Sequence, residues 1–209
     1  IVYNRGTPKY NALRESHIAP YDVIAPYTFY VMKSQNELAK EEKELLRRAP
    51  KVFRKVDTKT SAIDKLDEII NARSFKELLM KAPWLDTDVA RIIYRNRKIL
   101  KEIRTMVKNI YKHKIVSSRS NIKSDSIIIL NSHEKHIPVS ALIDSASAMK
   151  LLRIYLNEQF RRSRVLRDAM RELVVPLLRP NLVFDSVETA SRVKLALGRL
   201  KKYKDIVYK

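Results

Sequence analysis

The sequence predicts an α+β fold that is mostly α-helical and carries four or five short strands. Apolar residues recur at the three- and four-residue spacing of a buried helical face over most of the chain. Strand-like runs are short, and the clearest of them is Ile127–Leu130. The 209 residues include only 2 glycines and no cysteine. The fold must therefore be stabilised by an apolar core and not by disulfides.

The first element that the pattern predicts is a strand. Pro20 and Pro26 lack a backbone N–H and hold the residues before them in extended conformations, so no helix can run through this segment. The alternation in Thr28–Val31 then predicts a strand. Ser34 with Glu37 three residues later is typical of a capping box, and it predicts the start of the first helix.

A strand and two helices are predicted next. Lys51–Asp57 indicates a strand that ends at an aspartate. The helix after it has an apolar stripe, and we expect Thr58 or Thr60 to cap it. The members of the stripe are Ala62, Ile63, Leu66, Ile69 and Ile70. A second capping box, Ser74–Glu77, opens a short helix that Pro83 ends.

The longest helix is predicted to run from Asp86 to about His113. Its apolar residues fall on one face, which we expect to point inward. They are Val89, Ile92, Ile93, Ile99, Leu100, Ile103, Val107 and Ile110. The only aromatic residues in this span are Tyr94 and Tyr111.

The chain changes character after this helix. Residues 117–126 are polar and predict a loop, whereas Ile127–Leu130 and His136–Val139 predict two strands. We therefore expect one domain, 1–209, with room for two lobes, 1–114 and 140–209, joined by the short-strand segment 115–139.

Three helices complete the prediction. Two are expected over 144–160 and 163–178, and Pro176 must kink the last turn of the second. Asp185 and Glu188 are placed to cap a final helix that runs toward Tyr203.

The net charge of the chain is +20, from 43 lysines and arginines against 23 acidic residues. Such a balance favours a polyanion as partner. Half of it falls between Arg91 and Lys123, where Glu102 is the single acid. The eleven basic residues of this span are Arg91, Arg95, Arg97, Lys98, Lys101, Arg104, Lys108, Lys112, Lys114, Arg119 and Lys123. We favour a solvated helical face over a polyanion-binding face, because a charge run alone is a weak signal.

Catalytic, metal and cofactor sites are not predicted for this chain. His133 and His136 are three residues apart in an apparent turn, which is not the i, i+4 helical spacing of a zincin. No glycine lies between positions 7 and 197, which excludes a glycine-rich phosphate loop there. With two tyrosines in its basic helix and no tight glycine turn, the chain also lacks the usual signs of nucleic-acid binding.

Three motifs resemble those of a known family. Two Ala-Pro pairs, Ala19-Pro20 and Ala25-Pro26, precede Phe29 in the predicted first strand. The central match is the segment Lys51–Asp57, and the closing match is Pro180-Asn181-Leu182 followed by Thr189. Their order and spacing resemble the extracytoplasmic domains of bacterial seven-transmembrane HD-domain phosphohydrolases, which cleave cyclic di-AMP. Ser16-His17 stand where the family usually has a glycine.

The resemblance implies an extracytoplasmic sensor domain at the membrane of a bacterium. It would relay the binding of an external ligand or protein through transmembrane helices, outside this chain, to a cytoplasmic hydrolase. The catalytic HD chemistry needs a His-Asp pair, and this chain has none. Near the membrane, Lys201, Lys202, Lys204 and Lys209 would meet anionic lipid. The alternative is a soluble basic helical module that binds nucleic acid.

Two residues of the closing motif have a structural interpretation that we favour over ligand contact. Asn181 follows Pro180, and its side chain is expected to accept a hydrogen bond from its own backbone in an Asx-turn. Thr189 is expected in the first turn of the last helix.

Overall fold

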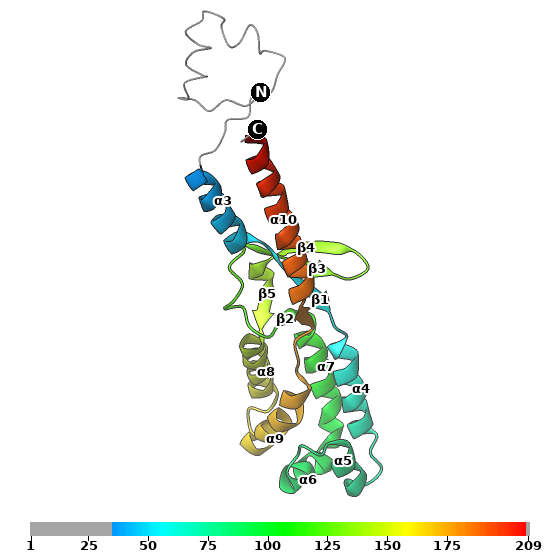
Figure 1. The fold of residues 1–209 in the computed structure, drawn as a ribbon. Coiled ribbons are helices and arrows are strands. Elements are labelled where there is room, and N and C mark those ends of the chain that lie inside the picture. Colours follow the sequence, from blue (N-terminus) through cyan, green and yellow to red (C-terminus); the bar gives the residue numbers. More distant parts are fainter. Residues whose placement is uncertain (1–34, 208–209) are drawn as a thin grey trace, which may run out of the picture. The chain divides into compact units, whose positions relative to one another are not determined.

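The computed structural model describes residues 35–207, and within them it confirms a mostly helical α+β fold (Figure 1). The predicted strand Thr28–Val31 and Ser34 lie outside the described residues. The helices are α3 (Gln35–Arg48), α4 (Thr58–Ile70), α5 (Phe75–Lys81), α6 (Thr87–Arg95), α7 (Leu100–Ile110), α8 (Ser145–Gln159), α9 (Arg164–Val174) and α10 (Ser186–Val207). The strands are β1 (Lys51–Lys55), β2 (Lys114–Val116), β3 (Ser126–Leu130), β4 (Glu134–Pro138), β5 (Leu142–Asp144) and β6 (Leu182–Phe184).

The chain divides into two compact units. One comprises residues 50–186, with every described strand and the helices α4 to α9. The described part of the other contains α3 and nearly all of α10. The predicted division into lobes 1–114 and 140–209 differs from these two units, and the predicted division stays a prediction.

Two small sheets form one end of the 50–186 unit. The larger has the order β4-β3-β1-β6, with β1 parallel to β3 and antiparallel to β6. The smaller pairs β2 with β5 in parallel. Their inward side chains make a separate apolar cluster of Phe53, Val116, Ile127, Ile129, Ile137, Leu142 and Leu182. The predicted strands at 51, 127 and 136 are confirmed, whereas the three-residue strands β2 and β5 were not predicted.

The second and larger core lies among the helices. Its fully buried members include Leu66 and Ile69 of α4, Ile103 and Ile110 of α7, and Leu152 of α8. Helix α7 packs against α4 and α8, while α9 packs against α6 and α8. Figure 1 shows α5, α6 and α9 at the end of this helical layer that is farthest from the sheets. The predicted apolar stripes are thus confirmed as core.

The prediction of one long helix from Asp86 to His113 is wrong. The helix breaks at Asn96, where α6 ends and the short 3-10 turn η1 (Arg97–Ile99) leads into α7. The Asn96 side chain donates to the Ile92 carbonyl at 2.8 Å, and its backbone N–H donates to the Ile93 carbonyl at 3.0 Å. An asparagine that satisfies the last carbonyls of a turn in this way competes with continuation of the helix. The break lets α6 and α7 pack on different neighbours.

The cap predicted for α4 is also wrong. Asp57, and neither Thr58 nor Thr60, is its N-cap, because the Asp57 carboxylate accepts from the Thr60 backbone N–H at 3.1 Å. A carboxylate there satisfies an orphan N–H and also complements the positive end of the helix dipole. The Ser74 cap of α5 is confirmed, with its hydroxyl accepting from the Glu77 N–H at 3.1 Å.

Helices α8 and α10 lie near their predicted bounds, whereas the prediction that α9 continues to 178 with a kink at Pro176 is wrong. Asp144 caps α8 and Ser163 caps α9. Pro176 falls in a 3-10 turn, η3 (Val175–Leu177), which ends the regular helix α9 at Val174. Helix α10 begins directly after Asp185, has Glu188 in its first turn, and is the longest described helix at 22 residues.

Two of these caps titrate below the usual range. The backbone N–H of Thr60, followed by its hydroxyl, lowers the pKa of Asp57 below its ordinary value of 3.8. The backbone N–H and the hydroxyl of Ser147 lower the pKa of Asp144 in the same way, and Arg119 adds to the effect. A carboxylate whose folded pKa is lowered stabilises the fold fully above its unfolded pKa, and this stabilisation is lost as pH falls through the folded pKa.

We therefore predict that Asp57→Asn with Asp144→Asn weakens the pH dependence of stability. Asparagine also caps helices well, so the variant should lose little stability at neutral pH. Between about pH 5 and about pH 2 the melting temperature of the wild type should fall relative to that of the variant, because the wild-type caps become protonated. Thermal unfolding over this range measures the gap. The matched control is Asp125→Asn, at an exposed position outside the helices, and a gap that stays constant with pH would contradict the prediction.

Candidate functional site

The segment 153–171, which runs from the middle of α8 into α9, contains arginine and no lysine. Between residues 153 and 171 there are six arginines and no lysine, and the arginines are Arg153, Arg161, Arg162, Arg164, Arg167 and Arg171. The charge analysis of residues 91–123 misses this run, since its total charge is lower. The signal that identifies it is the choice of arginine, whose planar guanidinium forms paired hydrogen bonds with phosphate and carboxylate groups.

The hairpin is held by its own turn and by the helical core. Ser163 caps α9, its hydroxyl accepting from the Leu166 N–H at 3.2 Å, and its own N–H donates to the Phe160 carbonyl at 3.2 Å. Phe160 is buried, as are Leu156 of α8 and Met170 of α9. With these apolar faces fixed, the polar faces of the two helices are fixed as well.

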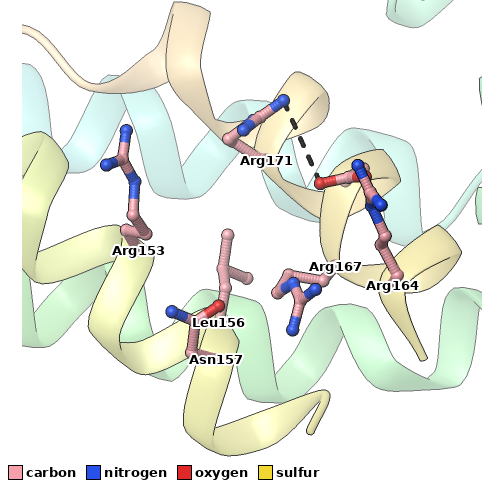
Figure 2. Close-up of a pocket in the computed structure, with 7 residues that line it drawn as sticks. Arg153, Leu156, Asn157, Arg164, Arg167 and Arg171 are labelled. Atoms are coloured by element: carbon pink, nitrogen blue, oxygen red, sulfur yellow. Dashed lines mark ion pairs between the residues drawn. The ribbon is translucent and has the colours of Figure 1, made fainter. Parts of the chain in front are cut away.

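Helical spacing puts the arginines of each helix on one side. Arg164, Arg167 and Arg171 are separated by three and four residues on α9, and Arg153 and Asn157 by four on α8. Figure 2 shows the α9 arginines across an open space from Arg153 and Asn157. We call the cavity between them the arginine pocket.

The arginine pocket has a volume of about 470 Å³. It is lined by four arginines, Asn157, Leu156 and Asp168. Leu156 is only 1% exposed, so the apolar part of the lining belongs to the buried core. Arginine side chains from two different helices thus surround a hollow with an apolar base.

Positive charge in the arginine pocket exceeds what the protein itself neutralises. Asp168 is the only acid in the lining, and its carboxylate lies 3.6 Å from Arg164 Nε and 4.0 Å from an Arg171 amino group. Both distances exceed those of a good charge-assisted hydrogen bond. Within residues 35–207, Arg153 and Arg167 form no ion pair. Four arginines against one aspartate leave the lining with a formal charge of 4 − 1 = +3.

A second cavity of about 690 Å³ lies beside the start of α4. Its lining mixes Asp57, Asp64 and Glu68 with Lys65 and Arg179, and Lys65 already pairs with Glu68 at 2.9 Å. Among the described residues, the Thr58 hydroxyl and the Trp84 indole N–H in its wall find no hydrogen-bond partner, and both atoms are fully enclosed. A molecule in the cavity could not reach them as they stand. The arginine pocket is therefore the better candidate site.

The positions of the predicted family motif are described only in part. Ala19, Pro20, Ala25, Pro26 and Phe29 lie outside the described residues. Leu182 is buried in β6, directly after Pro180 and Asn181, and Thr189 lies in the first turn of α10. Lys201, Lys202 and Lys204 belong to α10, while Lys209 lies outside the described residues.

Asn181 makes long-range hydrogen bonds, and the predicted Asx-turn is wrong. Its side-chain oxygen accepts from the Ile115 N–H at 2.7 Å, and its side-chain amide donates to the His113 carbonyl at 2.8 Å. Its backbone N–H donates to the Ile115 carbonyl at 3.1 Å, and its carbonyl accepts from the Val56 N–H at 2.9 Å. Asn181 therefore joins the start of β2 to the segment between η3 and β6. Its role is structural, as expected, but the hydrogen bonds run to distant residues and not to its own turn.

The basic run at 91–123 is not only a solvated face. Arg104 binds Asp67 at 2.8 Å and so links α7 to α4, and Arg119 donates to the Leu142 carbonyl at 2.8 Å. Arg97 donates to the Ala72 carbonyl and lies over the Tyr94 ring, 5.1 Å from its centroid. Other members of the run, such as Arg95 and Lys101, are exposed as expected. Part of the charge thus stabilises the fold.

The structure adds two observations on sites that the sequence raised. His136 Nε2 lies 2.9 Å from a Glu134 carboxylate oxygen on β4, and both side chains are exposed. Among the described residues, no three histidine, cysteine or acidic side chains come together in a way that could hold a metal ion. Within the same residues, no helix has the length and apolar character to span a bilayer.

Comparison with known protein families gives one match over nearly the whole chain. The family model described as "7TM-HD extracellular" matches residues 14–209. This confirms the resemblance carried by the Ala-Pro pairs and by the closing Pro180-Asn181-Leu182 motif. No curated protein and no solved structure matches the chain.

We predict that Asn181→Ala destabilises the protein by about 1–3 kcal/mol, because it leaves the buried Ile115 N–H without a partner. Asn181→Asp keeps the acceptor for that N–H but sets a carboxylate oxygen against the His113 carbonyl, so it should destabilise the protein as well, and less at low pH, where the protonated carboxyl can donate to that carbonyl. Urea unfolding of both variants measures the difference. The control is Asn131→Ala at an exposed turn, and a loss no larger than that of the control would contradict the prediction.

Proposed function

We propose that this chain, which belongs to the family of extracellular domains of seven-transmembrane HD proteins, is the sensor of a membrane-bound cyclic di-AMP phosphodiesterase. The observation that carries the proposal is the family match over residues 14–209. Family membership implies a membrane-associated, extracytoplasmic location. The identity of the internal substrate and the relay of a signal are parts of the proposal.

The composition of the chain supports a division of labour between this domain and the hydrolase. An HD active site uses an adjacent His-Asp pair and further histidines and aspartates around metal ions. The four histidines here are His17, His113, His133 and His136, and an aspartate follows none of them. In the proposal, hydrolysis therefore belongs to another part of the parent protein, and this chain needs no cofactor.

The relay is proposed to work by a shift of populations. A ligand that binds one arrangement of the domain better than another biases the equilibrium by its difference in affinity. Helix α9, the turn η3, strand β6 and helix α10 follow one another in the chain with few residues between them. A change at α9 therefore has a short covalent route to α10, which we propose as the output helix.

The first prediction of this proposal concerns activity. The isolated 209-residue chain should not hydrolyse cyclic di-AMP with or without manganese, whereas the full-length protein in membranes should. Product release measured by chromatography separates the two. The control is a full-length variant without the HD-domain His-Asp pair. Turnover by the isolated chain that survives repurification would contradict the assignment of catalysis to another domain.

A full-length variant in which a flexible linker replaces residues 14–209 tests the sensor role. It should keep basal hydrolysis and lose any response to molecules added on the extracytoplasmic side. An unchanged response would show that sensing lies elsewhere in the parent protein.

The second prediction concerns contact with anionic lipid. Each basic residue near an anionic surface contributes about 1 kcal/mol, so Lys201, Lys202 and Lys204 together correspond to roughly 100-fold in affinity. Changing the three to Gln should weaken binding to phosphatidylglycerol vesicles, and binding of the wild type should itself fall steeply with salt. Vesicle sedimentation at low and physiological salt measures both effects.

The matched control removes three lysines from the exposed part of the basic run, with Lys98, Lys101 and Lys112 changed to Gln. It should bind vesicles more tightly than the first variant. Equal losses in the two variants would contradict a specific role for the α10 lysines. Tight nucleic-acid binding at physiological salt, with no vesicle binding at low salt, would instead favour the nucleic-acid module.

A further inference from the structure

We propose that the arginine pocket between α8 and α9 binds a small phosphate-bearing ligand. The inference rests on the proposed sensor function for its biological role and names the class of ligand that this function would detect. The binding itself follows from the residues of the pocket and is tested without the hydrolase.

The geometry points to an anion that bridges two helices. Arg153 comes from α8, and Arg164, Arg167 and Arg171 come from α9, on opposite sides of the cavity (Figure 2). Like charges that face one another repel, and Asp168 offsets only one of the four. An anion in the cavity would satisfy guanidinium groups from both sides at once.

The number and kind of donors favour phosphate over a single carboxylate. A carboxylate presents two oxygens in one plane, which suits one guanidinium fork. A phosphate monoester presents three terminal oxygens in different directions and carries nearly two negative charges at neutral pH. Four arginines with a lining charge of +3 match the second group better.

The size and lining of the pocket favour an organic phosphate. A volume of about 470 Å³ lies within the range of small-molecule sites and exceeds what one phosphate group fills. The Asn157 amide provides a donor and an acceptor for the rest of the ligand. A phosphate ester of a small polar molecule fits this combination.

The choice of arginine is a second observation, and it is independent of the cavity. The basic run at 91–123 mixes five arginines with six lysines, as expected where charge alone is needed. The α8–α9 segment at 153–171 has six arginines and no lysine. Lysine acts as a point charge, whereas arginine offers a rigid fork of donors, so the bias toward arginine indicates directed hydrogen bonding.

The test is isothermal titration calorimetry, which measures the affinity of the 209-residue chain for sn-glycerol 3-phosphate, inorganic phosphate and malonate. We expect the phosphate ester to bind more tightly than malonate, which has two negative charges but no phosphate. Arg153→Gln with Arg167→Gln should weaken binding of the ester at least about tenfold, because hydrogen bonds to charged groups contribute about 1.5–3 kcal/mol each. These two arginines are chosen because neither forms an ion pair within residues 35–207.

The matched control is Arg91→Gln with Arg95→Gln, which removes the same charge from exposed positions on α6. It should change the affinity less than twofold. Arg153→Lys with Arg167→Lys keeps the charge in the pocket and should still weaken binding, since lysine cannot form the paired bonds. If the Gln variant fails to fold, as judged by thermal unfolding, the Lys variant decides.

Three results would overturn the inference. They are no binding of the ester at millimolar concentration together with no pocket-dependent binding of vesicles, equal losses in pocket and control variants, and full affinity of the Lys variant. Titration with phosphatidylglycerol vesicles separates the possible sources of the phosphate: a pocket-dependent signal with vesicles alone would identify a lipid headgroup and exclude a soluble ester. Ester binding without any effect on hydrolysis by the full-length protein would leave the site intact and contradict the sensor function instead.

Discussion

Four hydrogen bonds made by Asn181 join the two sheets of the 50–186 unit. Its side chain and its backbone N–H bond to His113 and Ile115 at the start of β2. Its carbonyl accepts from the Val56 N–H, just after β1. Because β6 starts at the next residue, the joint fixes its register against the central strand β1. The joint thereby also fixes the position of β6, the strand that precedes α10 in the chain. The closing motif of the family is therefore a structural junction between segments more than 60 residues apart in sequence.

Arginine stabilises the fold in one part of the molecule and leaves charge uncompensated in another. Arg97, Arg104 and Arg119 each donate to a partner in a different element, so their charge or donor capacity is used within the protein. In the lining of the arginine pocket Asp168 is the single acid among four arginines, and its carboxylate lies 3.6 Å from Arg164 and 4.0 Å from Arg171. Uncompensated charge around a cavity costs free energy through repulsion, and an external anion would remove that cost.

Local patterns in the sequence predict the elements that local physics controls. The helical stripes, the Ser74 cap and the apolar strand β3 were all predicted, since each depends on residues within a few positions. Asn96 breaks the predicted long helix by bonding to the carbonyls of Ile92 and Ile93, and an asparagine alone does not reveal that choice. Strands β2 and β5 have three residues each and exist because they pair with one another, which no local pattern encodes.

The site was missed for a related reason. The prediction considered residues 91–123 because their total charge is the highest. The choice between arginine and lysine says more about ligand binding than the number of basic residues does. Arg153 and the three arginines of α9 line one pocket only because the turn at Phe160–Ser163 folds α8 back against α9. The signal available in the sequence was the absence of lysine, and its meaning depends on that hairpin.

A ligand that bridges α8 and α9 has a physical means of acting on the rest of the chain. It can shift an equilibrium only if it binds one arrangement better than another, and a bridging anion meets this condition because its affinity depends on the spacing of the two helices. Helix α9 packs against α6 and α8 and, at its C-terminal end, against η3, so a change in spacing can be absorbed there. There Pro176 has already replaced the regular helix with the turn η3, which lacks the full set of helical hydrogen bonds. The segment from η3 to Asn181 is thus where the motion of α9 would be stopped by the sheet joint or passed on through β6 to α10.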